Sequence, residues 1–356
     1  MNKAFLVLPL IIISLLTAVW SGWLRIGWDL PVVNTAPHHG ILMVNSFLAS
    51  LIFLERAVTF NNKLVLLLPF IHALSAIAVL TGFIQAAEII VVAGSAGFMF
   101  MCAYFIYRYR ELYYYVFLAG ATSLLVGNII LLSTQRYPSA VTWWMGFLLF
   151  TIVAERLELS RFLSLTKKKT AFLLAALASV LVTLFLPFHL HGQVFLALAM
   201  TATAAWLLRY DMAWHSIKIG GQHRYSGILL ITGYVWILVT AVFLIMGSNF
   251  AFGYDAALHS FFIGFVFSMI FSHAPIILPA VARIPVKIYR PFLYVWFILL
   301  QFTLLLRIAA DMMTWIQIRK IAGISNGLVI LLFFITVGFI VRQELAKRKI
   351  SAKAKL

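Results

Sequence analysis

Residues 254–281 read YDAALHSFFIGFVFSMIFSHAPIILPAV, and this stretch decides the fold class. The run is long enough to cross the roughly 30 Å hydrocarbon core of a bilayer as a helix, and only two histidines and one aspartate make it ionisable. The rest of the chain has the same character: 64% of its 356 residues are hydrophobic and 10% are charged. Soluble domains carry about a quarter charged residues, so the composition indicates a membrane protein.

Eleven further apolar runs have the length of a membrane-spanning helix, which requires about 20 residues. The twelve predicted spans are residues 4–24, 38–58, 64–86, 88–107, 112–133, 138–156, 171–190, 192–209, 226–247, 255–281, 290–311 and 322–342. We therefore predict an all-α polytopic membrane protein with a single transmembrane domain over residues 1–356. The first span lacks a small-x-small cleavage site, so we interpret it as an uncleaved helix rather than a signal peptide.

The placement of Lys and Arg gives the predicted orientation. The inner loops and tails hold 22 of the 27 basic residues when both termini are cytoplasmic. The other five are Arg25, Arg136, Arg307, Arg319 and Lys320. The formal net charge of +17 is thus explained by topology, and nucleic acid is excluded as a partner.

Two short matches suggest internal repetition. Glu55 and Arg56 end the second span, and Glu155 and Arg156 end the sixth, 100 residues later. The tenth span stands four spans further on, so spans 2, 6 and 10 could correspond in three four-helix units. We favour structural ion pairs over proton relays for these residues.

Ionisable groups within spans are costly and mark candidate sites. His38 and His39 open span 2, and His259 lies in the first turns of span 10, so three imidazoles reach the outer membrane level from two helices. They are either metal ligands or simply hydrated interfacial side chains. A single cysteine, Cys102, excludes thiolate metal sites within one chain, so any metal must be held by histidine. The loop histidines are interpreted as solvated: His189, His191, His215 and His223.

A second pair of histidines lies near mid-membrane. His72 follows Lys63 by nine residues and His273 precedes Arg283 by ten, which places each about 14 Å above the inner boundary. They could form a central metal site, or each could bond a neighbouring carbonyl where Pro275 disturbs the helix.

The segments 28–56 (WDLPVVNTAPHHGILMVNSFLASLIFLER) and 254–281 resemble the two histidine-bearing regions of NnrS-type membrane proteins. His39 matches the second histidine of the family's first motif, His38 stands in for the first, and Gly40 replaces its glutamate. In the later segment His259 and Gly264 match, whereas His273 and its proline replace the family's downstream motif.

This resemblance implies a haem protein of the bacterial cytoplasmic membrane, with copper as a further metal and nitric oxide as the small ligand to which it responds. Its implied haem ligands are His39 and His259, with His38 as substitute, while His72 and His273 would form a second metal or haem site. Arg307 could hold a haem propionate or pair with Asp311, four residues later.

The layout is also similar to the large subunit of haem–copper oxidases, which has twelve spans and low-spin haem ligands on spans 2 and 10. Spans 6 and 7 have no histidine in their interiors, so a complete binuclear centre is not expected, and nor is an oxidase or reductase activity. A cofactor-free transporter is the main alternative, because Asn45, Gln85 and Asn128 are intramembrane polar groups of the kind transporters use. No metalloprotease or serine-hydrolase motif supports an intramembrane enzyme.

Overall fold

The computed structural model describes residues 7–60, 63–163, 165–282 and 286–353. These residues are helical or in loops, and no strand occurs among them. The helices are α1 (Leu8–Arg25), η2 (Val33–His38), η3 (Ile41–Ala49), α2 (Ser50–Ala57), η4 (Lys63–Leu66), α3 (Leu67–Ala73), α4 (Ser75–Leu80), α5 (Ile84–Tyr109), α6 (Leu112–Thr134), α7 (Tyr137–Ser160), α8 (Lys167–Thr183), η5 (Phe188–Gly192), α9 (Gln193–Tyr210), α10 (Ala213–Ile219), α11 (Gly221–Met246), η6 (Gly247–Asn249), α12 (Gly253–His259), η7 (Ser260–Phe267), α13 (Ser268–Ala282), α14 (Leu293–Met313) and α15 (Ile316–Lys353). The predicted all-α class is confirmed.

Nine helical segments in the described part of the chain are long and apolar enough to cross a membrane. The other three predicted spans coincide with helices that are shorter or interrupted. Span 2 is divided between η3 and α2, span 3 corresponds to the shorter apolar helix of residues 64–80, and span 7 corresponds to the 17-residue α8. Span 8 corresponds to α9, which is part of one of the nine long segments. The structure therefore shows a multi-pass membrane architecture.

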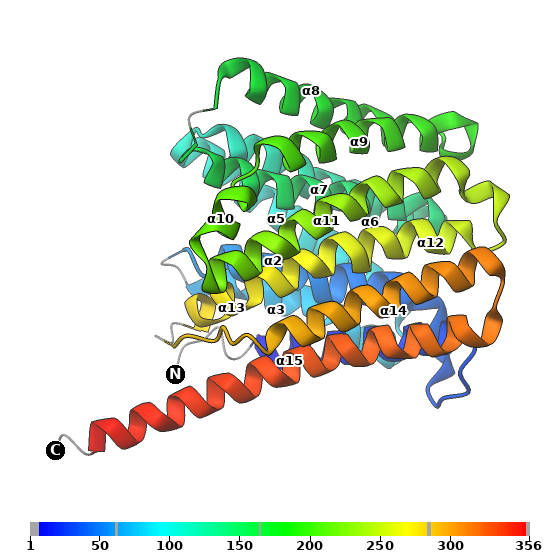
Figure 1. The fold of residues 1–356 in the computed structure, drawn as a ribbon. Coiled ribbons are helices and arrows are strands. Elements are labelled where there is room, and N and C mark those ends of the chain that lie inside the picture. Colours follow the sequence, from blue (N-terminus) through cyan, green and yellow to red (C-terminus); the bar gives the residue numbers. More distant parts are fainter. Residues whose placement is uncertain (1–6, 61–62, 164, 283–285, 354–356) are drawn as a thin grey trace.

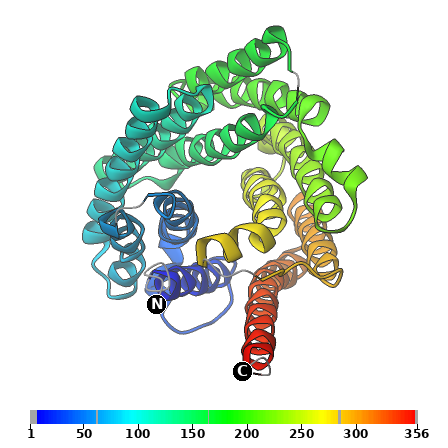
Figure 2. The same cartoon turned by 90° about the vertical axis from the view of Figure 1, so that its left-hand side faces the viewer.

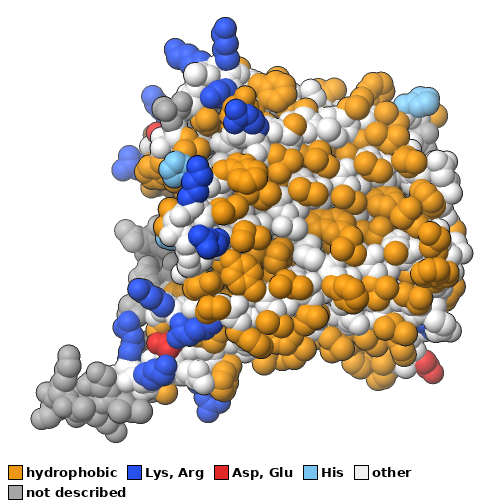
Figure 3. Space-filling view, viewed as in Figure 1, with side chains coloured by type: hydrophobic (Ala, Val, Ile, Leu, Met, Phe, Trp, Pro, Cys, Tyr) orange, Lys and Arg blue, Asp and Glu red, His pale blue; other side chains and the backbone are white. Residues whose placement is uncertain are grey.

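The helices lie side by side with their loops gathered at the two ends of the bundle (Figure 1). α15 runs past the bundle at the end where the chain both starts and finishes. Lys and Arg side chains gather at this same end, and a broad apolar surface separates it from the other end (Figure 3). This distribution is the one that the positive-inside rule associates with a cytoplasmic face.

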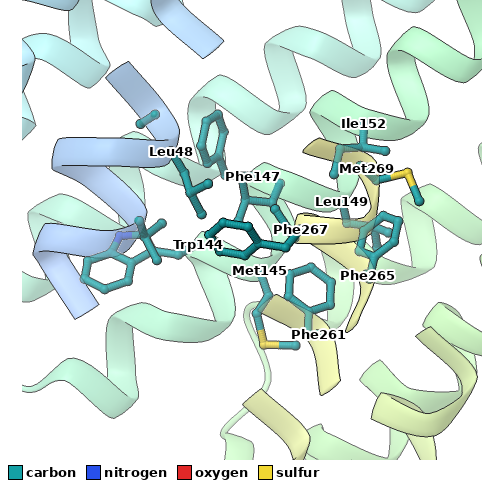
Figure 4. Close-up of a cluster of buried hydrophobic side chains, with 14 of the residues drawn as sticks. Leu48, Trp144, Met145, Phe147, Leu149, Ile152, Phe261, Phe265, Phe267 and Met269 are labelled. Carbon is teal, nitrogen blue, oxygen red and sulfur yellow. The ribbon is translucent and has the colours of Figure 1, made fainter. Parts of the chain in front are cut away.

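Viewed along the helix axes, the cyan and green helices form an arc, and the yellow segment around η7 and α13 lies inside it (Figure 2). α7 supplies much of the buried core: Trp144, Phe147 and neighbouring residues pack against Phe265 and Phe267 of η7 (Figure 4). The segments that carry His39, His259 and His273 are therefore held from several sides, which is the condition for a fixed site.

Two long π-helical segments distinguish this core. η3 covers Ile41–Ala49 and begins two residues after His39, and η7 covers Ser260–Phe267 and begins directly after His259. π-Helical turns are rare, occur mostly as single turns and are frequent at functional sites. Both predicted outer ligands thus stand at the start of an unusual backbone segment.

Candidate functional site at the outer end of the bundle

A cavity of about 380 Å³ is lined by residues at the end of α1 and the starts of α12 and α15. These helix ends lie at the end of the bundle opposite the basic surface (Figures 1 and 3). The volume of the cavity lies in the range of small-molecule sites. His39, His259 and Arg307, three of the predicted site residues, all line it. The structure therefore brings together side chains from α12, α14 and the segment before η3, which are far apart in the sequence.

His39 is held with one ring nitrogen turned to the protein. Its Nδ1 lies 2.9 Å from the carbonyl oxygen of Ala18 and 3.3 Å from Oγ of Ser21. A carbonyl can only accept, so Nδ1 carries the proton and Nε2 keeps a free lone pair. The close approach depends on Gly22, where a Cβ would lie 2.9 Å from Cε1 of the His39 ring.

His259 is oriented in the same way by its own helix. Its Nδ1 lies 2.8 Å from the carbonyl oxygen of Asp255, one turn earlier, and 3.3 Å from Oδ1 of the same residue. Nε2 of His259, like Nε2 of His39, has no hydrogen-bond partner among the described residues. Metal-binding histidines typically use one nitrogen for such a second bond, which fixes the tautomer and the orientation of the ring.

Arginines outnumber carboxylates around the cavity. Arg25, Arg307 and Arg319 line it, together with one acid, Asp255. Arg307 Nη2 lies 2.8 Å and Arg319 Nη2 3.0 Å from the Asp255 carboxylate. The lining thus suits a ligand with an anionic edge.

Arg307 does not pair with Asp311, one of its two predicted partners. Its partner is Asp255, whereas Asp311 accepts a 2.7 Å bond from Nε of Arg319. The expected Arg307–Asp311 ion pair does not form in the described part of the chain. Arg307 is only 5% exposed, and its Nε has no hydrogen-bond partner in the part of the chain that the structure describes, so part of its donor capacity is unused there.

A buried polar network supports the inner wall of this outer cavity. Asn128 donates to Oδ1 of Asn45 over 2.8 Å and accepts a 2.9 Å bond from Nε1 of Trp144, which lines the cavity. Asn45 and Asn128, considered above as transport groups, therefore bind each other. Gln85, the third such group, is exposed. Two of the three groups thus have a structural role as hydrogen-bond partners of each other.

His38 points to a different partner. Its Nδ1 lies 2.9 Å from the hydroxyl of Tyr137, and the residue is not among those that line the cavity. Tyr137 does line it, so His38 stands behind a wall residue. Of the two adjacent histidines, the one that reaches the cavity is His39.

The two mid-membrane histidines have separate surroundings. His72 is fully buried, packs 4.6 Å from the Phe53 ring centroid, and has no hydrogen bond at either nitrogen. His273 donates from Nδ1 to the carbonyl oxygen of Met269 over 2.7 Å and accepts a 2.9 Å bond at Nε2 from Arg156. No contact between the two histidines is seen in the described residues, so their shared metal site stays a prediction. Within the same residues, no group of three or more His, Cys, Asp or Glu side chains is placed to hold a metal ion.

The Glu–Arg repeats meet at the inner end of the bundle. Arg56 contacts Glu155 through its Nη2 and lies 3.7 Å from Glu55 and 3.8 Å from Glu158. Its guanidinium also lies 4.3 Å from the centroid of the Phe117 ring. Glu55, Arg56 and Glu155 are thus placed as structural ion pairs, whereas Arg156 bonds His273 instead.

Sequence reasoning missed several lining residues. Trp23, Arg25, Tyr137 and Arg319 enter the cavity from α1, α7 and α15, and nothing local in the sequence places those helices together. Asp255 could have been found, because its position four residues before His259 puts both on one helix face.

The chain belongs to a protein family described as a domain of unknown function (DUF8744), whose model matches residues 4–342. The match covers almost the whole chain, so all the elements that build the cavity belong to the family domain. Searches of curated proteins and of solved structures found no match.

Proposed function

We propose that this chain is an integral haem-binding protein whose iron is held by His39 and His259 in the outer cavity. The proposal keeps the twelve-span topology with cytoplasmic termini and a place in the bacterial cytoplasmic membrane. It also keeps the NnrS-type relationship suggested by segments 28–56 and 254–281, which makes nitric oxide the diatomic ligand to test first.

One observation carries the proposal: two imidazoles from different helices line one cavity, each with Nδ1 bonded to a backbone carbonyl and Nε2 left free. Axial haem ligands need neutral imidazoles in a fixed orientation. A bound haem would supply an iron that exchanges one electron and binds diatomic molecules. The chain's own residues would orient the two rings and keep water away.

The remainder of the lining has the residue types that a porphyrin would need. Trp23, Trp144 and Phe267 offer flat apolar surfaces, and three arginines line the same cavity and would be available to an anionic edge. Because Arg307 has an unused Nε and is nearly buried, we assign it to a propionate alongside its bond to Asp255. His38 would contribute only after rotation away from Tyr137, so we place copper, if the chain binds it, outside the cavity wall.

A cofactor-free transporter is the second candidate, and one observation favours it. A smaller cavity of about 140 Å³, lined by Glu55, Glu155 and His273, lies toward the inner end of the same helices. Alternating access requires a path to the substrate site from each side of the membrane, and two cavities along one helix set would supply the two halves of such a path. Between them, Phe47 and Phe267 stack with centroids 6.3 Å apart, and Phe334 packs edge-on against Phe47.

The deciding experiment is metal analysis and visible absorption of protein purified in detergent from haem-supplemented cells. We expect a Soret band and about one iron per chain, both lost in His39→Ala and in His259→Ala. His223→Ala, which removes an exposed histidine, is the matched control and should keep both. A folded, colourless wild-type protein would refute the haem proposal and favour transport assays.

A further inference from the structure

The inner cavity has a composition unlike that of the outer one. Most of its lining is aliphatic or aromatic, including Leu48, Leu51, Ile270 and Phe334. Its ionisable groups are two carboxylates, Glu55 and Glu155, and one histidine. Such a space is suited to an apolar ligand with a small polar head.

The histidine of this cavity is not available to a ligand. Both nitrogens of His273 are bonded, one to the Met269 carbonyl and one to Arg156. Glu55, in contrast, accepts no hydrogen bond among the described residues, and the Arg56 guanidinium lies 3.7 Å from its carboxylate. The free acceptor at the cavity is therefore a carboxylate.

The charges around the cavity exclude an anionic head. Arg56 is shared by three carboxylates, while Arg156 is directed to a neutral ring. With Asp211 beside Arg156, four acids face these two arginines, so the surroundings carry no excess positive charge for an anionic head. The lining therefore selects a head that donates hydrogen bonds, and a carboxylate accepts most strongly from hydroxyl or ammonium donors.

The size of the cavity limits which ligand heads can fit. Its volume of about 140 Å³ is close to the roughly 150 Å³ of an apolar protein cavity that accommodates benzene. Leu51, Ile52 and Ile270 remain partly exposed, so the cavity communicates with the apolar outer surface of the bundle. A six-membered ring with hydroxyl groups and an apolar tail could enter from the lipid.

We propose that the inner cavity binds the head of a membrane-borne hydroquinone, with the Glu55 and Glu155 carboxylates accepting from its hydroxyl groups. This proposal is independent of the haem proposal, because the inner cavity has no lining residue in common with the outer cavity that contains His39 and His259. It is a binding site that the sequence patterns alone did not indicate.

The test measures binding of a decyl-substituted benzohydroquinone to the full chain in detergent under reducing conditions, by quenching of tryptophan fluorescence. We expect saturable binding that weakens at least about tenfold when the two hydroxyls are methylated and about tenfold in Glu55→Gln. Glu111→Gln, at an exposed carboxylate, should bind as the wild type does.

A second variant keeps the test decisive if Glu55→Gln does not fold. Leu51→Trp fills the cavity without changing its charge and should also abolish binding. The proposal is overturned if the dimethyl ether binds as well as the hydroquinone, if Leu51→Trp has no effect, or if decylamine displaces the hydroquinone at lower concentration than the hydroquinone itself requires. The last result would assign the cavity to an amphiphilic amine.

Discussion

The outer and inner cavities are built on the same helices yet present opposite chemistry. His259 and His273 lie on one continuous helical segment, and each donates from Nδ1 to the carbonyl oxygen four residues earlier, over 2.8 and 2.7 Å. They differ at Nε2, which is free in His259 and bonded to Arg156 in His273. Whether such a histidine can bind a metal thus depends on whether its Nε2 is already hydrogen-bonded, and sequence spacing does not reveal this.

The same contrast holds for the charged residues. At the outer cavity one aspartate lies between two arginines, and at the inner cavity one arginine lies among three glutamates. The outer lining therefore favours anions, whereas the inner lining favours hydrogen-bond donors. Four experiments can break or sharpen this comparison.

The largest expected effect is on the inner ion cluster. Arg56→Leu leaves Glu55, Glu155 and Glu158 without their shared cation in an apolar setting, and we expect it to lower the free energy of unfolding by about 3–5 kcal/mol. Denaturant unfolding in detergent, followed by tryptophan fluorescence, measures the change. Arg108→Leu, at an exposed site, should stay within about 0.5 kcal/mol of the wild type. An equal loss in both variants would show that the ion pairs of Arg56 contribute no more to stability than an exposed arginine does.

Replacing the two histidines of one helix separates their roles. His273→Ala leaves the buried Arg156 without its acceptor, and we expect a loss of about 1.5–3 kcal/mol in unfolding free energy with iron content unchanged. His259→Ala should lose the iron. Denaturant unfolding and metal analysis of the two proteins, side by side, provide the measurement. If His273→Ala loses iron and His259→Ala retains it, then His273 rather than His259 is the iron ligand.

The fold was largely predictable from the sequence, and the site only partly. Apolar runs mark helices because each must satisfy its backbone internally in lipid, so the all-α class followed from composition. His39 and His259 line one cavity, which agrees with their expected position at one membrane level, but their role as ligands stays a prediction. The Arg156–His273 bond and the Asp255–Arg319 pair were not, because they depend on how helices rotate about their axes and which ones become neighbours. Nor did any local sequence pattern predict that the helices after His39 and His259 would be π-helical.

A glycine next to His39 tests the geometry of the outer cavity. Gly22→Ala introduces a Cβ 2.9 Å from the His39 ring, so the ring must move and its Nδ1 bond to Ala18 must weaken. We expect a cost of about 1 kcal/mol and a lower ratio of Soret to protein absorbance. Gly338→Ala on α15 meets nothing within 4 Å and should be neutral or stabilising by about 0.5–1 kcal/mol. Equal haem content in the two variants would argue against His39 as a ligand.

The smallest expected effect concerns the neighbouring histidine. Tyr137→Phe removes the hydroxyl that bonds Nδ1 of His38, and we expect a loss of about 0.5–1.5 kcal/mol in unfolding free energy, the usual net value of one hydrogen bond. The Soret band should keep its position and intensity, because His38 lies outside the cavity lining while His39 keeps its own carbonyl partner. A shifted band would mean that the freed His38 ring has reached the iron. His38 and His39 would then both be able to bind the iron, and the hydrogen-bond partner of Nδ1 would not identify which of them is the ligand.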